Sequence, residues 1–191
     1  MLLVASLSLA GCGINTIPAS EEVAKAKWAD VQAQYQRRAD LVGNLVATVR
    51  AAAKFEQDTL TRVTEARSRA TSVQVSAEDL QDPAKVAQFQ AAQGALSQSL
   101  GRLLATVEAY PELKANQNFV ALQSQLEGTE NRIAVSVRDY NEAVRAYNTR
   151  IRTFPDMIGA KVVYGAKPMV PFQAKAGAED APDVGAMFNG A

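Results

Sequence analysis

The candidates for chemistry considered first are the single thiol and the carboxylates of the chain, because it has no imidazole. Cys12 is the only cysteine, and histidine is absent from all 191 residues. This composition excludes Cys/His zinc sites, haem attachment through CxxCH, Ser-His-Asp triads and Cys-His dyads. Acidic doublets at 21/22, 78/79 and 179/180 are more typical of helix caps and solvated patches than of paired catalytic carboxylates. We therefore predict no catalytic residue, no metal site and no cofactor.

The chemistry that Cys12 supports is acylation. It follows an uncharged apolar run, residues 1–10, of the length expected for the hydrophobic region of a signal peptide and too short for a bilayer span of about 20 residues. The three residues before it match the lipobox of bacterial lipoproteins: Leu9, Ala10 and Gly11. In that motif the thiolate forms a thioether to diacylglycerol, and cleavage frees the cysteine amine for a further acyl chain. We predict that residues 1–11 are a signal peptide and that Cys12 is lipidated.

Two alternatives remain for Cys12: a chance cysteine behind a secretory signal, or a fragment of a longer transmembrane helix. Lipidation would give stable attachment, because two or more acyl chains hold a protein at a membrane where one anchors it marginally. Gly13 follows the cysteine. By resemblance to proteobacterial lipoproteins, a residue other than aspartate there favours the outer membrane over the inner one. We therefore expect a lipid-anchored protein of the cell envelope that faces the periplasm.

The composition is typical of a soluble helical protein that has no net charge. Apolar residues make up 48% of the chain and charged residues 21%, which is ordinary for a helical domain. Twenty basic residues offset twenty acidic ones, so no net charge draws the chain to nucleic acid or to an anionic membrane surface. We expect one domain and no nucleic-acid partner.

The hydrophobic pattern predicts a long first helix over residues 20–70. Ser20 with Glu21 and Glu22 is typical of an N-cap and a favourably charged first turn. Its apolar stripe is spaced by threes, fours and one seven: Trp28, Val31, Tyr35, Val42, Leu45 and Val49. The stripe continues to the end of the range, which gives about 50 residues and a rod of roughly 75 Å. Gly43 is the weak point, at a cost of about 1 kcal/mol relative to alanine.

Two further helices follow. Asp82 and Pro83 supply an N-cap and an N1 proline for a second helix, which ends at the Tyr-Pro pair 110/111. A third helix begins near Asn116 with apolar steps of three and four residues, and Pro155 ends it. Beyond that proline we expect one more helical turn and an extended piece packed on the bundle end.

Together these elements predict an all-α, elongated up-and-down bundle of three long helices, with room for a short fourth. The bundle spans residues 20–165. A lipidated tether over residues 12–19 precedes it, and an extended or disordered tail over residues 166–191 follows it.

Polar residues interrupt the apolar stripes, and burying them unpaired would be costly. Six of them form a candidate polar groove between helices: Arg38, Asp40, Asn44, Glu130, Arg138 and Asn141. The preferred interpretation is that such residues pair across the bundle and set helix register, and the groove is the alternative. The Tyr-Asn pairs at 140/141 and 147/148 repeat after seven residues on one face, and buried tyrosines with hydrogen-bonded hydroxyls are the default interpretation. A hydrolase using Asp40 or Glu130 ranks last, because no partner acid or histidine lies beside them.

Three segments resemble the LemA family of bacterial proteins. They are YQRRADLVGNLVATVR at 35–50, the block from FQAAQGALSQSLGRLL to RDYNEAVRAYNTRI at 89–151, and FPDMIGAKVVYG at 154–165. The resemblance implies a helical bundle tethered at the membrane, outside the cytoplasm, and it carries no agreed biochemical activity. We expect a scaffold or adaptor for other envelope proteins. The alternative is a binder of a small ligand or of a lipid or cell-wall fragment in the polar groove.

Overall fold

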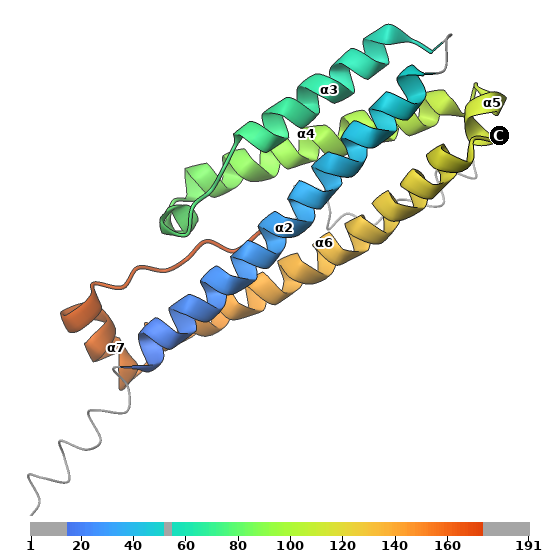
Figure 1. Cartoon of the computed structure of the whole chain (residues 1–191). Coiled ribbons are helices and arrows are strands. Elements are labelled where there is room, and N and C mark those ends of the chain that lie inside the picture. The colour runs from blue at the N-terminus through green and yellow to red at the C-terminus, as the bar shows by residue number, and fades with distance from the viewer. Residues whose placement is uncertain (1–14, 52–54, 174–191) are drawn as a thin grey trace, which may run out of the picture.

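A computed structural model describes residues 15–51 and 55–173, and they form an elongated bundle of helices (Figure 1). The long helices are α2 (Thr16–Arg50), α3 (Gln57–Ser72), α4 (Pro83–Val107) and α6 (Gln117–Arg150). The shorter elements are η1 (Glu78–Gln81), α5 (Pro111–Lys114), α7 (Asp156–Gly159) and the π-helical turn η2 (Ala160–Tyr164). The predicted all-α bundle is confirmed. Cys12, the predicted signal peptide and residues 174–191 of the predicted tail lie outside the described residues.

The prediction of one continuous helix over residues 20–70 is wrong. α2 ends at Arg50, and α3 begins at Gln57 and runs back antiparallel to α2 (Figure 1). The apolar spacing continues through this reversal because both helices bury one face against the same core, so periodicity alone does not reveal the turn. Phe55 is buried at the turn and its ring lies 4.9 Å from that of Tyr110. The bundle thus gains a fourth helix.

Gly43 lies inside an unbroken α2. The Arg67 side chain from α3 covers it, and Arg67 Nε donates to the Ala39 carbonyl at 2.6 Å. A Cβ at position 43 would lie 3.1 Å from Arg67 Cζ, which is closer than ordinary contact. The glycine therefore gives a guanidinium room to reach the backbone of the neighbouring helix, and it does not end or break α2.

The predicted N-cap of the second long helix is confirmed, the predicted first cap is wrong, and the structure adds a cap at Asn116. Asp82 accepts from the Ala84 amide at 2.9 Å at the start of α4, and Asn116 accepts from the Asn118 amide at 2.9 Å at the start of α6. α2 begins at Thr16, four residues before Ser20. The Ser20 hydroxyl donates to the Ile17 carbonyl at 2.9 Å and does not cap a helix. The second part of the predicted tether is therefore helical.

Two antiparallel pairs build the bundle. α2 and α6 are the long pair, and α3 with α4 covers only the part of it that is distant from Thr16 (Figure 1). The remaining length is covered by the loop before α4 and by an extended segment, residues 165–173, which we call the strap. Gly165 has φ of 58° and turns the chain from η2 into the strap. The Val170 amide then donates to the Leu80 carbonyl at 2.8 Å, which joins strap and loop.

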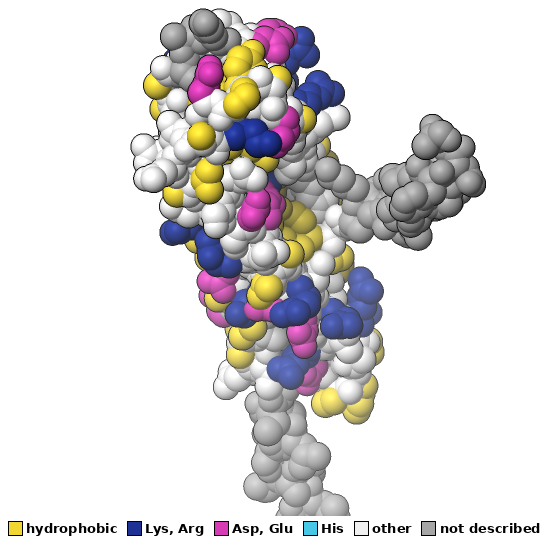
Figure 2. Space-filling model, turned by 90° about the vertical axis from the view of Figure 1, so that its right-hand side faces the viewer, with side chains coloured by type: hydrophobic (Ala, Val, Ile, Leu, Met, Phe, Trp, Pro, Cys, Tyr) yellow, Lys and Arg dark blue, Asp and Glu magenta, His cyan; other side chains and the backbone are white. Residues whose placement is uncertain are grey.

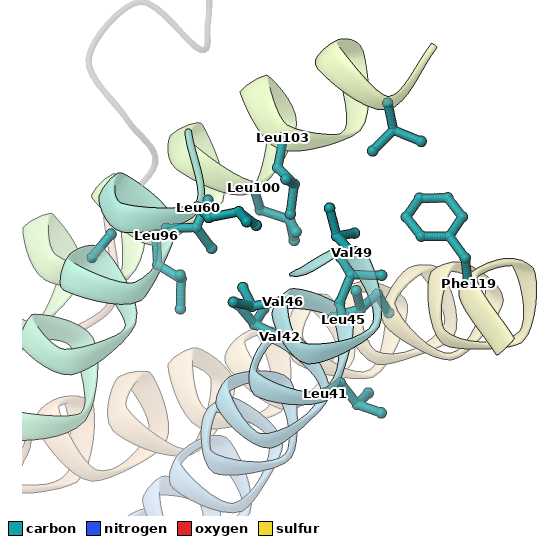
Figure 3. Close-up of a cluster of buried hydrophobic side chains, with 14 of the residues drawn as sticks. Leu41, Val42, Leu45, Val46, Val49, Leu60, Leu96, Leu100, Leu103 and Phe119 are labelled. Carbon is teal, nitrogen blue, oxygen red and sulfur yellow. The ribbon is translucent and has the colours of Figure 1, made fainter. Parts of the chain in front are cut away.

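The core has two parts along the long axis. The distal cluster, under α3 and α4, is mostly aliphatic and includes Leu41, Val42, Leu45, Val46, Val49, Leu60, Leu96, Leu100, Leu103 and Phe119 (Figure 3). The proximal cluster lies towards the start of α2 and under the strap, and includes Ile17, Trp28, Val31, Phe89, Tyr140, Val144, Tyr147 and Met169. Within residues 15–51 and 55–173, no helix is long and apolar enough to cross a bilayer.

Candidate functional site

Arg38 lies between the two clusters and is only 2% exposed. Its Nη1 donates to Ser97 Oγ at 2.9 Å and to Glu130 Oε1 at 3.2 Å. Its Nη2 donates to the carbonyl and to the side-chain Oε1 of Gln93, at 3.2 and 2.6 Å. A planar guanidinium with several donors suits this role, because one side chain satisfies acceptors in different directions. Gln93 extends the contacts to α3 by donating to the Ala70 carbonyl at 3.0 Å.

The Arg38 network therefore joins all four long helices at one level of the bundle. Arg38 comes from α2, Gln93 and Ser97 from α4, Glu130 from α6, and the Ala70 carbonyl from α3. The guanidinium carbon also lies 4.9 Å from the centre of the Tyr35 ring, a cation–π contact. Because Glu130 is 45% exposed at its side chain, the ion pair opens to solvent on the α6 side.

The other four residues of the candidate groove make contacts elsewhere. Asp40 is exposed, accepts from Gln36 Nε2 at 3.0 Å and lies 3.9 Å from Arg67 Nη2. Asn44 and Arg138 are exposed as well, and Arg138 pairs with its neighbour Asp139 at 3.5 Å. Asn141 binds the strap. The structure thus brings Arg38 and Glu130 together and separates them from the rest of the predicted set.

An open cavity of about 350 Å³ lies beside the Arg38 network, between α2, the end of α3 and α4. Amide side chains and two aromatic rings line it: Gln32, Gln36, Gln74, Gln93, Tyr35 and Phe89. Because amides both donate and accept hydrogen bonds, this lining suits an uncharged polar ligand. Among the residues that the structure describes, no three carboxylate or thiol side chains gather as a set of metal ligands.

The Tyr-Asn pairs of α6 hold the strap by its backbone. Asn141 binds both backbone groups of Phe172: its Nδ2 donates to the carbonyl at 3.0 Å and its Oδ1 accepts from the amide at 2.7 Å. Asn148 binds Met169 in the same way, with both bonds at 2.8 Å. Each asparagine therefore satisfies one residue of an extended chain as a neighbouring β-strand would.

The tyrosines of the same two pairs add a second row of bonds. Tyr140 donates to the Val170 carbonyl at 2.8 Å, and Tyr147 donates to the Lys167 carbonyl at 3.1 Å. The two strap residues bound by the asparagines, Met169 and Phe172, are three positions apart, and so are the two bound by the tyrosines, Lys167 and Val170. Seven helical residues rise about 10.5 Å, and three extended residues span about 10 Å. The seven-residue repeat of α6 thus matches a three-residue repeat of the strap, which runs antiparallel to it.

Two strap side chains fill the groove between these bonds. Met169 is 2% exposed. The Phe172 ring lies among four aromatic rings, with centroid distances of 5.7 Å to Trp28, 6.1 Å to Tyr140 and 6.3 Å to both Tyr35 and Phe89. Trp28 Nε1 donates to the Val75 carbonyl at 2.9 Å and so fixes the loop that closes the groove. The arrangement is that of an extended peptide bound through two side-chain anchors, Met169 and Phe172, and six hydrogen bonds to its backbone.

Burial changes the acidity of the tyrosines in this groove. Desolvation raises the pKa of Tyr140 well above its usual value and also raises the pKa of Tyr147, because the phenolate would lose its hydration. Both hydroxyls therefore stay protonated and remain hydrogen-bond donors to the strap. Sequence reasoning identified the Tyr-Asn repeat but not its partner. The signal that could have found it is the match between seven helical residues and three extended ones.

Comparison with known proteins places this chain beside one family. The sequence profile of the LemA family matches residues 27–185. Magnetosome protein MamQ 2 of Paramagnetospirillum magneticum is 27% identical over 157 residues, which cover 74% of this chain and 58% of that protein. Protein LemA of Metamycoplasma hominis is 26% identical over 125 residues, covering 65% of this chain and 52% of its own length. The chain thus spans little more than half of these relatives.

Proposed function

Since the chain belongs to the LemA family, we propose that it is an acyl-anchored protein of the bacterial cell envelope that acts as a non-enzymatic scaffold or adaptor. The anchor is Cys12, in the stretch LSLAGC at residues 7–12. That stretch is the single observation that carries the proposal. The partners are other envelope proteins, and the bundle faces the periplasm, with the outer membrane favoured over the inner one.

The described structure supports this arrangement through the position of α2. Its first residue, Thr16, follows Cys12 after three intervening residues, which reach at most about 14 Å. The proximal end of the bundle would therefore be held close to the bilayer. α2 and α6, at 35 and 34 residues, extend about 50 Å from there. Such a rod presents long helical faces to other proteins at a distance from the membrane.

The anchor is tested by Cys12→Ser in cells that express the whole chain. We expect the lipidated mature form to disappear and the protein to leave the detergent phase in a phase-partitioning assay, because serine forms no thioether. Ser8→Ala is the matched control, since it changes the same apolar run and leaves the lipobox cysteine in place. Unchanged detergent partitioning of Cys12→Ser refutes the acyl anchor.

The adaptor role is tested by cross-linking in intact cells followed by mass spectrometry. We expect the same envelope protein to recur as a neighbour of the exposed faces of α3 and α4, and to be lost when those faces carry charge reversals at Arg62 and Arg102, which are exposed. Recovery of no recurrent protein neighbour contradicts the adaptor role.

A second function, binding of a small ligand or of a lipid or cell-wall fragment, is favoured by the amide-lined cavity beside Arg38. Muropeptides and short-chain phospholipids are the probes for a thermal-shift screen. A ligand at 100 times its dissociation constant stabilises the fold by about 2.7 kcal/mol. A shift that is lost in Gln36→Ala supports this function, and no shift with either class of probe removes it.

A further inference from the structure

Five large apolar side chains are exposed together in one short stretch of chain. They belong to the turn after α6, to α7 and to η2: Phe154, Ile158, Val162, Val163 and Tyr164, with exposures of 76, 55, 79, 59 and 43%. We call them the apolar corner. A helical turn that leaves most of its apolar side chains in solvent marks an interaction surface. Figure 2 shows hydrophobic side chains at the lower end of the described molecule, below a group of Lys and Arg side chains.

Hydrogen bonds fix the corner to the start of α2. The Thr16 hydroxyl donates to Asp156 Oδ2 at 3.2 Å, and Arg150 Nη1 donates to the Thr16 carbonyl at 3.1 Å. Arg150 Nε also lies 3.6 Å from Asp156 Oδ2. The corner is therefore held at the end of the bundle from which the chain leads back to Cys12. Any membrane attachment at that cysteine brings these side chains to the bilayer surface.

The local charge differs from that of the whole chain. The whole chain has no net charge, yet residues 150–167 carry four basic side chains and one acidic side chain. The basic ones are Arg150, Arg152, Lys161 and Lys167. The acidic one, Asp156, is already paired with Arg150. Lys161 is exposed beside Val162 and Val163. The corner thus combines apolar tips with an excess of positive charge, which complements an anionic headgroup layer.

We propose that the apolar corner inserts into the headgroup region of an anionic lipid bilayer and forms a second membrane contact beside the anchor. The proposal rests on the proposed function, because the acyl chains bring the corner to the surface. The physical reason is that an aromatic and aliphatic turn with flanking basic residues is stable at the interface, where apolar tips leave water and cations meet phosphate. The contact sets the orientation of the bundle on the membrane, which a flexible lipid tether alone would leave free.

A fluorescence experiment on the protein purified from membranes and reconstituted into vesicles tests this contact. The reporter is V162W, and the matched control is V120W. Val120 is also an exposed valine, at 51%. It lies near the opposite end of α6, about 45 Å from the end that leads into the corner. Trp28, which is buried, contributes the same background to both. We expect brominated phosphatidylglycerol to cause a loss of fluorescence in V162W and none beyond the Trp28 background in V120W. We expect a smaller loss in vesicles of brominated phosphatidylcholine.

Equal quenching of V162W and V120W overturns the proposal. So does a V162W emission that is shifted to the blue without quenching by either lipid, because it would mean that protein covers the corner, either residues 174–191 or a second copy. R152E/K161E should reduce the quenching of V162W in anionic vesicles only, with circular dichroism unchanged. The two proposals fail separately. Absence of acyl mass with quenching intact removes the anchor alone, and acyl mass without quenching removes the corner contact alone.

Discussion

The two ends of the α2/α6 pair are buried by different means. At the distal end α3 and α4 complete a four-helix packing, and the side chains between them are almost all aliphatic (Figure 3). At the proximal end no second helical pair is present among the described residues, and the nine-residue strap with the loop before α4 covers the pair instead. The same two helices thus use one half of their length in a helical core and the other half as a groove for an extended segment.

The two ends differ in the side chains that α2 and α6 must supply beneath a helix and beneath an extended segment. A helix satisfies its own backbone, so aliphatic side chains suffice beneath it. An extended segment brings unpaired amides and carbonyls, which must be satisfied by polar side chains from the groove. This is why Tyr140, Asn141, Tyr147 and Asn148 occur on the proximal part of α6. The Arg38 network lies between the distal part, which helices cover, and the proximal part, which the strap covers. At this level the core changes from mainly aliphatic side chains to packing around aromatic side chains.

Trp28→Ala should have the largest effect on the proximal half. It removes a buried ring that contacts Phe89, Tyr140 and Phe172, and we expect a loss of about 4 kcal/mol in unfolding free energy. Urea unfolding measures it. Leu103→Ala in the distal cluster is the counterpart, at about 3 kcal/mol. If hydrogen exchange of the strap amides accelerates as much in Leu103→Ala as in Trp28→Ala, the two halves are not distinct.

Arg38→Ala should come next, because it removes the side chain between the halves. It leaves Gln93 Oε1 and Ser97 without their donor, and we expect a loss of about 3 kcal/mol. Arg38→Met, which keeps most of the volume, should lose less. Urea unfolding with probes in both halves checks this. Two separate transitions in Arg38→Ala would show that the network couples the halves, and an unchanged midpoint would contradict its structural role.

Asn148→Ala should have a smaller and local effect. It removes both bonds to Met169, and we expect the strap to lose about 2 kcal/mol of protection. Hydrogen exchange of the Met169 amide measures it. Asn131→Ala is the control, because Asn131 is exposed on the same helix. Equal exchange rates in the two variants would mean that side-chain anchors alone hold the strap.

High pH should have the smallest effect, a gradual loss of unfolding free energy in the proximal half. Burial raises the pKa of Tyr140 and Tyr147, so the folded state keeps protons that the unfolded chain releases from about pH 10. The stability is therefore fully present below that pH and falls as the pH rises further, by at most about 1.4 kcal/mol per pH unit for each tyrosine. Urea midpoints across this range measure it. Y147F should flatten the dependence, and a dependence unchanged in Y140F and Y147F would exclude these tyrosines.

Sequence patterns predicted the all-α bundle, the cap at Asp82 and the regular third helix that begins near Asn116, because these depend on neighbouring residues. They did not predict that the chain reverses between the end of α2 at Arg50 and the start of α3 at Gln57, since both helices present the same apolar period to one core. The partner of the Tyr-Asn repeat could not be read either, because it depends on a contact between segments 20 to 31 residues apart. For the candidate groove, sequence identified Arg38 and Glu130 as stripe interruptions but not the Gln93 and Ser97 side chains that join them.

We propose that the proximal end of the bundle is its membrane end and is held there through Cys12. The intact mass of the protein purified from native membranes tests it most directly. We expect a polypeptide that begins at Cys12 and carries the additional mass of diacylglycerol and a further acyl chain on that residue. A polypeptide that begins upstream of Cys12 and carries no acyl mass on its sulfur would contradict it.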